Sequence, residues 1–309
     1  MDRKDNLDLQ ALEVAKQHMG KFAWPTVALG LALLLAYLAT PVLVVMELMP
    51  LVAAVPLLAF LTYAAYTVLH DAAHGSISGS HTSLRWLNEA MGYIAAWIVM
   101  IPLTAHRHEH LAHHRHTNDP DNDPDACFTE LTRSPLHAVR ALTKMYAGQY
   151  LHYIRNRWNK GPKSQNLYLC LEVFFALVPR LAFVAMGFWV EGLALFVVAW
   201  SLGLMVLAFL FAYIVHTPHE AVGRYVDTST IVVDGLTGRL VTLLWGYQNY
   251  HSIHHLFPRV PFYTYRTIFE EIEPVMLARG APIYHLNVRG LQANAGQLSG
   301  NQKSYFASS

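Results

Sequence analysis

The chain has 309 residues, of which 54% are hydrophobic and only 14% are charged. Soluble proteins usually carry about 25% charged residues, so we expect lipid to solvate a large part of this chain. The formal net charge is +1, and the sequence has neither a basic stripe nor a groove-reading motif, which argues against a nucleic-acid-binding protein.

The N-terminal segment, residues 1–21, is not expected to be a secretory signal, because no short apolar core follows a basic start. Four apolar runs follow, each long enough to cross a bilayer, which takes roughly 20 helical residues. These runs are Phe22–Met46, Leu48–Leu69, Leu167–Val190 and Gly192–Val215. A fifth run, Ala90–Thr104, is too short to span and is expected to form an interfacial or buried helix.

The four spanning runs form two pairs, joined by tight links near Glu47 and near Glu191 that carry no Lys or Arg. We therefore expect two transmembrane hairpins. The long segment between them is rich in Lys and Arg, so the positive-inside rule places it and both termini in the cytoplasm. Arg180 lies deep in the third span and needs a partner there, but Glu172 is about two helical turns away and is not a sure one.

This pattern predicts an all-α, multi-pass integral membrane protein of the inner or plasma membrane, with a single domain over residues 1–309. The transmembrane hairpins and the central cytoplasmic segment would occupy residues 22–215. Residues 216–290 would form a cytoplasmic helical cap, and the small, polar residues 291–309 a disordered tail.

Thirteen of the 18 histidines fall in four clusters, "HDAAH", "HRHEHLAHHRH", "HTPHE" and "NYHSIHHLFP". The topology derived from hydropathy and from Lys and Arg places all four clusters on the same side of the membrane. The first cluster ends the second span, the second lies in the central segment, the third ends the fourth span, and the fourth lies in the cap. We therefore expect the clusters to meet at the cytoplasmic surface.

The spacing of the histidines favours a metal site. His70 and His74 are four residues apart, and each HxxHH motif repeats at i, i+3 and i+4, which places its imidazoles on one helix face. Imidazole is the commonest metal ligand among side chains. Since one zinc ion needs about four ligands, up to nine imidazoles indicate two metal ions, and nitrogen-rich sites suit Fe, Cu, Ni or Zn. Asp71 and the acidic run Asp119–Asp125 are expected to orient the imidazole rings.

The sequences "HDAAH", "HLAHH" followed by "TNDPDNDPD", and "HSIHHLFP" resemble the three histidine boxes of the membrane fatty acid desaturase superfamily. "TPHE", "YQNYHSIHHLFP" and "VPFYTY" are most similar to the desaturase-like β-carotene hydroxylases. The resemblance covers roughly Leu58 to Ile283. It implies a non-haem di-iron centre with O₂ as co-substrate, and an attack on C–H bonds of a lipid tail or a carotenoid ring that ends in desaturation or hydroxylation.

Carried over to this sequence, the resemblance implies nine iron ligands, His70, His74, His110, His113, His114, His219, His251, His254 and His255. The ligand role of His219 rests on the "PH" of "TPHE", while His106, His108 and His216 have no counterpart in the pattern. The chain has no GxGxxG loop and only two cysteines, so it carries no fused flavin or iron–sulfur donor. A separate electron donor of the ferredoxin or cytochrome b5 type is therefore implied.

Two other classes of protein share part of this pattern. A membrane zinc hydrolase is suggested by "HEHLAH", a near miss of HExxH, but the histidines are too many for one zinc ion. A metal transporter would carry its polar ligands at mid-membrane, and a bis-histidine haem carrier would need only one or two axial histidines. Neither class explains two histidine triplets.

Overall fold

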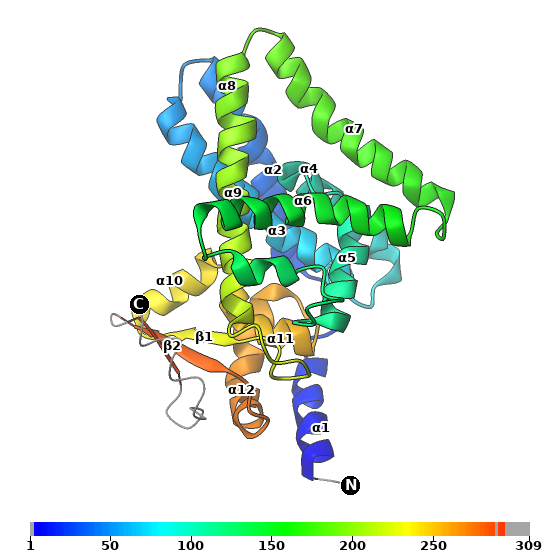
Figure 1. Ribbon diagram of the computed structural model, residues 1–309, viewed down its shortest axis with the longest axis vertical. Coiled ribbons are helices and arrows are strands. Elements are labelled where there is room, and N and C mark those ends of the chain that lie inside the picture. Colours follow the sequence, from blue (N-terminus) through cyan, green and yellow to red (C-terminus); the bar gives the residue numbers. More distant parts are fainter. Residues whose placement is uncertain (1–2, 288–289, 294–309) are drawn as a thin grey trace.

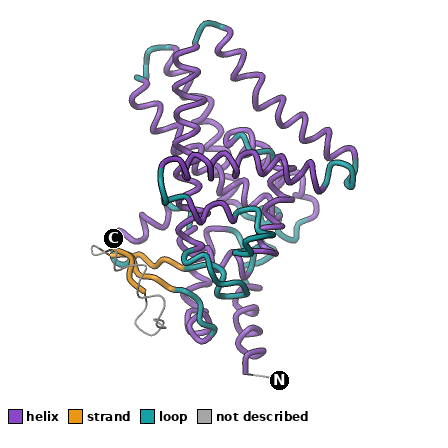
Figure 2. The backbone as a smooth tube through the Cα atoms, in the orientation of Figure 1, coloured by secondary structure: helices purple, strands orange, loops and turns teal. Residues whose placement is uncertain are grey.

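The computed structural model describes residues 3–287 and 290–293, most of them in helices (Figure 1, Figure 2). The α-helices are α1 Arg3–Lys16, α2 Trp24–Val45, α3 Leu51–His74, α4 Arg85–Val99, α5 Leu103–His116, α6 Pro135–Asn156, α7 Lys163–Ala185, α8 Trp189–Leu193, α9 Trp200–Leu207, α10 Leu236–Leu244, α11 His251–Leu256 and α12 Tyr265–Ala278. The strands are β1 Thr230–Val233, β2 Ile283–Asn287 and β3 Gly290–Ala293.

Four helices are long and apolar enough to cross a membrane, as predicted. They are α2, α3, α7 and the continuous helical stretch Trp189–His216, which contains α8 and α9. The link between α2 and α3 turns at Glu47, whose φ is +60°. Apolar side chains cover the outside of these helices, as on Leu35 and Val52, because lipid rather than water is their solvent.

Helix α3 is the centre of the bundle, with α2, α4 and α9 packed around it. Its buried face includes Leu58, Ala65 and Val68, whose exposed fractions are 1% or less. Helix α9 approaches closely at Gly203, where an added Cβ would lie 2.7 Å from the backbone oxygen of Ala59. Small residues at such contacts let membrane helices pack backbone to backbone.

The predicted short helix over Ala90–Thr104 is α4, and it ends earlier than expected. Met100 adopts a left-handed φ of +61°, Pro102 precedes the next helix, and α5 leaves at 94° to the helical stretch Thr82–Val99. This break turns α5, with its histidines, under the end of α3. The histidines of both helices therefore face one another.

Helix α7 leans away from α8 and α9 over much of its length (Figure 1). The guanidinium group of its Arg180 is nevertheless buried. It donates to the backbone oxygens of Ala176 and Trp97 and to the hydroxyl of Tyr37, and it lies over the Trp97 ring, 4.7 Å from the centroid. Backbone oxygens and aromatic rings, and not Glu172, therefore satisfy this charge inside the span.

The cap contains α10, α11 and α12, and α12 packs against α1. It also holds a small three-stranded sheet, in which β1 pairs in parallel with β2 and β2 antiparallel with β3. The all-α prediction left this sheet out, because strands of four or five residues give too short an alternation to detect. Residues 291–293, predicted to belong to a disordered tail, are part of β3; residues 294–309 lie outside the described residues.

Candidate metal centre

Four helical segments bring histidines to one end of the apolar spans (Figure 1). The last turn of α3 carries His70 and His74, and α5 carries His110, His113 and His114. Helix α11 carries His251, His254 and His255, and the final turn of the fourth span, Ile214–His216, ends in His216. Residues that are up to 185 positions apart in the chain (70 to 255) thus line one site.

A first group consists of five imidazoles whose ligand nitrogens all lie within 4.8 Å of one another: His70, His74, His110, His114 and His254. Within it, Nε2 of His114 lies 3.1 Å from Nε2 of His110 and 2.8 Å from Nε2 of His254. Two nitrogens that bind one metal ion at about 2.0–2.1 Å and at right angles are about 3 Å apart. The observed spacing therefore fits a shared metal ion.

A second group consists of His113, His216 and His255, again within 4.8 Å of one another. The Nε2 atoms of His113 and His216 are 3.1 Å apart. The ring of His251 lies 4.8 Å from that of His255 and 5.0 Å from that of His216, centroid to centroid. The two groups adjoin, because the ring of His255 stacks on that of His114 at 4.3 Å.

Several rings are held from outside through Nδ1. Nδ1 of His113 lies 2.8 Å from Oδ1 of Asp123, and Nδ1 of His254 lies 3.0 Å from the Tyr265 hydroxyl. When Nδ1–H donates outward, Nε2 is the unprotonated nitrogen and points toward the centre, as in metal-bound histidines. Asp123 thus has the orienting role predicted for the acidic run, whereas Asp71 accepts a hydrogen bond from Thr26.

Two other rings are held in the same way. His251 pairs with Oε1 of Gln248 and His216 with the backbone oxygen of Ala212, both at 2.8 Å from Nδ1. In contrast, both nitrogens of His70, and Nε2 of His74 and of His255, are buried without a hydrogen-bond partner. Buried polar atoms are rarely left unsatisfied in native proteins. Bound metal ions would satisfy these nitrogens, so the residues present fit a metal centre.

The protonation state of the cap histidines also suits metal binding. Burial, reinforced by the neighbouring imidazoles, holds the pKa of His251, His254 and His255 well below the ordinary value. Each imidazole is therefore neutral near pH 7 and has a free lone pair. A neutral ring is the form that binds a metal ion.

His219, a predicted ligand, lies outside both groups. The backbone turns after the fourth span, with the His219 N–H donating to the His216 oxygen, and the His219 ring packs on Tyr213 at 5.1 Å. His219 lines a cavity of about 290 Å³ with His113 and His216. His216, which matched no motif, belongs to the second group instead; its place at the end of a span, as for His74, was the signal that could have identified it.

His106, which the spacing left as a reserve candidate, is buried beside the site. Its Nδ1 pairs with Oε1 of Gln149, its ring stacks on that of His110 at 5.1 Å, and its Nε2 has no partner. It is not part of either histidine group.

A narrow cavity of about 20 Å³ adjoins the histidines. Five imidazoles contribute to its wall, those of His70, His110, His113, His216 and His251. The other lining residues are polar, namely Glu109, Asp125 and Gln149, or apolar, and the latter include Tyr66, Ile101, Phe128, Met145, Leu207 and Phe211. Part of the wall beside the imidazoles is therefore apolar.

Comparison with known proteins identifies the family. Residues 46–287 match the family described as fatty acid desaturase. The chain belongs to this family. Together with the four apolar helices, this membership makes it an integral membrane protein.

The similarity to individual proteins of the fatty acid desaturase family is more distant. The chain is 26% identical over 236 residues to a fatty acid desaturase of Bacillus subtilis (strain 168), covering 68% of this chain and 64% of that protein. It is 24% identical over 244 residues to a Delta(9) fatty acid conjugase-like enzyme of Dimorphotheca sinuata, covering 67% and 64%. A chloroplastic sn-2 acyl-lipid omega-3 desaturase (ferredoxin) of Helianthus annuus is 25% identical over 244 residues, covering 69% and 53%. The chain thus spans under two thirds of the length of these relatives.

Proposed function

We propose that the protein is an O₂-dependent membrane oxidoreductase of the fatty acid desaturase type, which oxidises C–H bonds of a lipid hydrocarbon at a pair of iron ions. One observation carries this proposal: buried imidazoles from four helical segments converge in two adjacent groups, each with the nitrogen spacing of a metal site. Membership of the fatty acid desaturase family supports the reaction class.

The two histidine groups divide the ligands. The first ion would be held by His70, His74, His110, His114 and His254, and the second by His113, His216 and His255. His251 lies outside both groups, but its ring adjoins those of His216 and His255, so we propose it as a further ligand of the second ion. In this proposal His216 would serve as a ligand where the resemblance implied His219. Two reduced iron ions supply, with O₂, an oxidising power that no side chain has.

The protein's own residues position the substrate and exclude water. The cavity beside the histidines has a volume of about 20 Å³, which is little more than one water molecule occupies. Ile101, Leu207 and Phe211 are part of its wall. A linear methylene chain passes such a constriction more easily than a substituted ring. We therefore favour desaturation of a fatty acyl chain, which also agrees with the names of the relatives.

Hydroxylation of a carotenoid ring is the second candidate reaction. It is favoured by the motif likeness at "YQNYHSIHHLFP" and "VPFYTY". In both reactions the substrate would enter from the bilayer, because the histidines lie at the ends of apolar spans.

Electrons would come from a separate carrier of the ferredoxin or cytochrome b5 type. The name of the Helianthus annuus relative, which includes ferredoxin, supports a carrier of this kind. His74 lines an open hollow of about 770 Å³ that also carries Arg85, Arg259 and Arg107, the last of which is ion-paired with Glu89 in the same wall. This basic hollow on the proposed cytoplasmic side suits an acidic electron carrier.

Expression in two hosts tests the reaction. One host makes β-carotene and the other has saturated acyl chains, and mass spectrometry follows the products. Loss of two hydrogens from an acyl chain is the expected result, whereas oxygen on the carotenoid ring would support the second candidate. No change in either host would contradict both.

The variant His254→Ala tests the site. We expect it to abolish product and to lower bound iron, because His254 belongs to the first group. The matched control is His137→Ala, which should change neither the product nor the bound iron. The ring of His137 is hydrogen-bonded to Ser134, the residue that precedes α6. About two irons per chain and no haem absorption band are expected in the purified protein. One zinc ion, or a haem band, would instead favour a zinc hydrolase or a haem carrier.

A further inference from the structure

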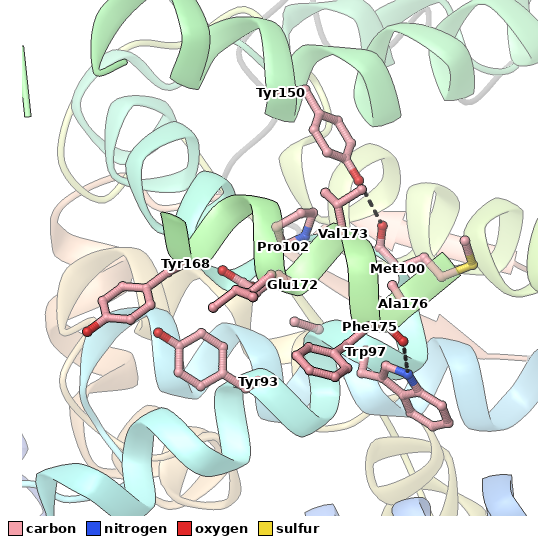
Figure 3. Close-up of a pocket in the computed structure, with 12 residues that line it drawn as sticks. Tyr93, Trp97, Met100, Pro102, Tyr150, Tyr168, Glu172, Val173, Phe175 and Ala176 are labelled. Carbon is pink, nitrogen blue, oxygen red and sulfur yellow. Dashed lines mark hydrogen bonds between the residues drawn. The ribbon is translucent and has the colours of Figure 1, made fainter. Parts of the chain in front are cut away.

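A separate cavity, of about 230 Å³, lies between α4, α6 and α7 (Figure 3). Its wall is mostly apolar and aromatic, with Tyr93 and Trp97 on α4 and Tyr168 and Phe175 on α7. The α4–α5 break separates it from the histidines. Met100 and Pro102 line this cavity, whereas Ile101, between them, lines the cavity beside the imidazoles.

The position of this cavity along α7 places it in the hydrocarbon layer. Glu172, in its wall, lies nine residues after Lys163, the first residue of α7, which is about 14 Å along the helix axis. The hydrocarbon core of a bilayer is roughly 30 Å thick, so Glu172 lies near the middle of the span. The neighbouring Phe174, Leu177 and Val178 are exposed and would face lipid. An occupant of this cavity is therefore drawn from the bilayer.

Glu172 is the one charged residue in the wall of this cavity. Its Oε1 accepts hydrogen bonds from the backbone N–H and the hydroxyl of Thr104, at 3.2 and 2.5 Å. Its Oε2 is buried and has no partner. The nearby Arg180 is bonded to Tyr37 and to backbone oxygens instead.

An unpaired carboxyl oxygen in apolar surroundings is costly, so a ligand or a water molecule is expected to pair with it. A hydroxyl group suits this role best, because it donates to an ionised carboxylate and can also accept from a neutral carboxyl. The cavity is smaller than the roughly 300–1,000 Å³ of sites that enclose a drug-sized ligand. It therefore takes part of a hydrocarbon chain together with one polar group.

We propose that this cavity binds the chain of a hydroxyl-bearing amphiphile from the bilayer, with Glu172 as the partner of its hydroxyl group. Tyr93, Trp97 and Phe175 contact the chain. This site concerns binding alone and stands or falls independently of the proposed oxidation at the histidines.

Quenching of tryptophan fluorescence by brominated lipids tests the site without turnover. The probes are the dibromides of methyl oleate and of methyl ricinoleate, which differ by one hydroxyl group. The Trp97 signal is taken as the difference between the full-length protein and its Trp97→Phe variant. We expect saturable quenching by both esters, with about tenfold tighter binding of the hydroxylated one, the factor expected for one additional hydrogen bond.

Substitutions at two positions separate the chain from the hydroxyl group. Glu172→Leu should abolish the preference for the hydroxylated ester, and Glu172→Gln, which keeps hydrogen-bonding atoms, should retain it. Ala176→Phe should fill the cavity and abolish the saturable quenching, since Ala176 is in its wall. Ala182→Phe, on the exposed side of the same helix, is the control and should change nothing.

Four results would overturn the proposal. The absence of saturable Trp97 quenching, or its persistence in Ala176→Phe, would show that the cavity does not bind the chain. Equal affinity for the two esters would show that no hydroxyl group is recognised. A preference that survives Glu172→Leu would show that Glu172 is not the partner of the hydroxyl group.

Discussion

Individual hydrogen bonds set the direction of the imidazoles. The Nε2 atoms of His254 and His114 are 2.8 Å apart, and the hydroxyl of Tyr265 lies 3.0 Å from Nδ1 of His254. Tyr265 is fully buried, and burial raises its pKa well above the ordinary value, so the phenol stays neutral. A neutral phenol can accept the Nδ1–H of a metal-bound imidazole.

We therefore predict that Tyr265→Phe weakens metal binding without removing a ligand. Loss of an outer partner of a metal-bound histidine typically costs 10–100-fold in metal affinity or activity, and a loss in this range, of about tenfold or more, is expected here. Iron per chain after dialysis against a graded chelator measures it. Tyr263→Phe, at the half-buried neighbour, is the control. Unchanged affinity in Tyr265→Phe would contradict the orienting role of Tyr265.

At the scale of residues, the sequence predicted which histidines of the same helix lie side by side. Spacing of i, i+3 and i+4 is a local property, so the grouping of His110 with His114 follows from the sequence alone. The choice between His216 and His219 does not, because it depends on how the backbone turns at the end of the fourth span. That turn is set by tertiary contacts.

At the scale of elements, the position of α3 decides how the site is built. Its last turn carries His70 and His74, and its middle, at Ala59 and Thr62, packs against α9 around Gly203. The hydropathy pattern predicted both helices as spans, but not their close approach. The same holds for the α4–α5 break, since a left-handed Met100 has no sequence signature of the kind that glycine gives.

We predict that Gly203→Val destabilises the protein. An added Cβ would lie 2.7 Å from the Ala59 oxygen and 2.8 Å from Cβ of Thr62, and overpacking of this kind typically costs about 1–3 kcal/mol. Gly148→Val is the matched control, because nothing lies within 4 Å of an added Cβ there. Thermal unfolding in detergent measures both. Equal unfolding temperatures of the Gly203→Val and Gly148→Val variants would show that α9 does not approach α3 at Gly203.

At the scale of the whole molecule, the histidine site joins the bundle to the cap. The ends of two spans and α5 contribute ligands on one side, and α11 contributes those of the cap. The four spans were predictable because hydropathy is summed over many residues. The three-stranded sheet was not, because its strands are short and β1 is distant in sequence from β2.

We predict that removing the metal destabilises the whole chain, and that the metal-free protein loses stability as the pH falls. A ligand present at 1,000 times its dissociation constant stabilises a protein by about 4 kcal/mol, which chelation would remove. In the metal-free protein, His251, His254 and His255 have pKa values below the ordinary 6.5. Below about pH 6.5 these three imidazoles bind more protons in the unfolded chain than in the folded one, so their contribution to stability falls as the pH drops.

Unfolding temperatures of chelated and iron-loaded protein between pH 5 and 8 provide the measurement. The iron-loaded protein should unfold at the higher temperature at every pH. A metal-free protein that becomes more stable toward pH 5 would contradict neutral imidazoles in the fold.

The order of the four histidine segments along the chain has a consequence for biosynthesis. His70 leaves the ribosome first and His255 follows 185 residues later (70 to 255), after all four spans have been made. Neither histidine group is complete until α11 has emerged, since His254 belongs to one group and His255 to the other. Insertion of the four spans therefore precedes the completion of either histidine group, and a metal ion that needs a whole group would bind only a chain that is already in the membrane.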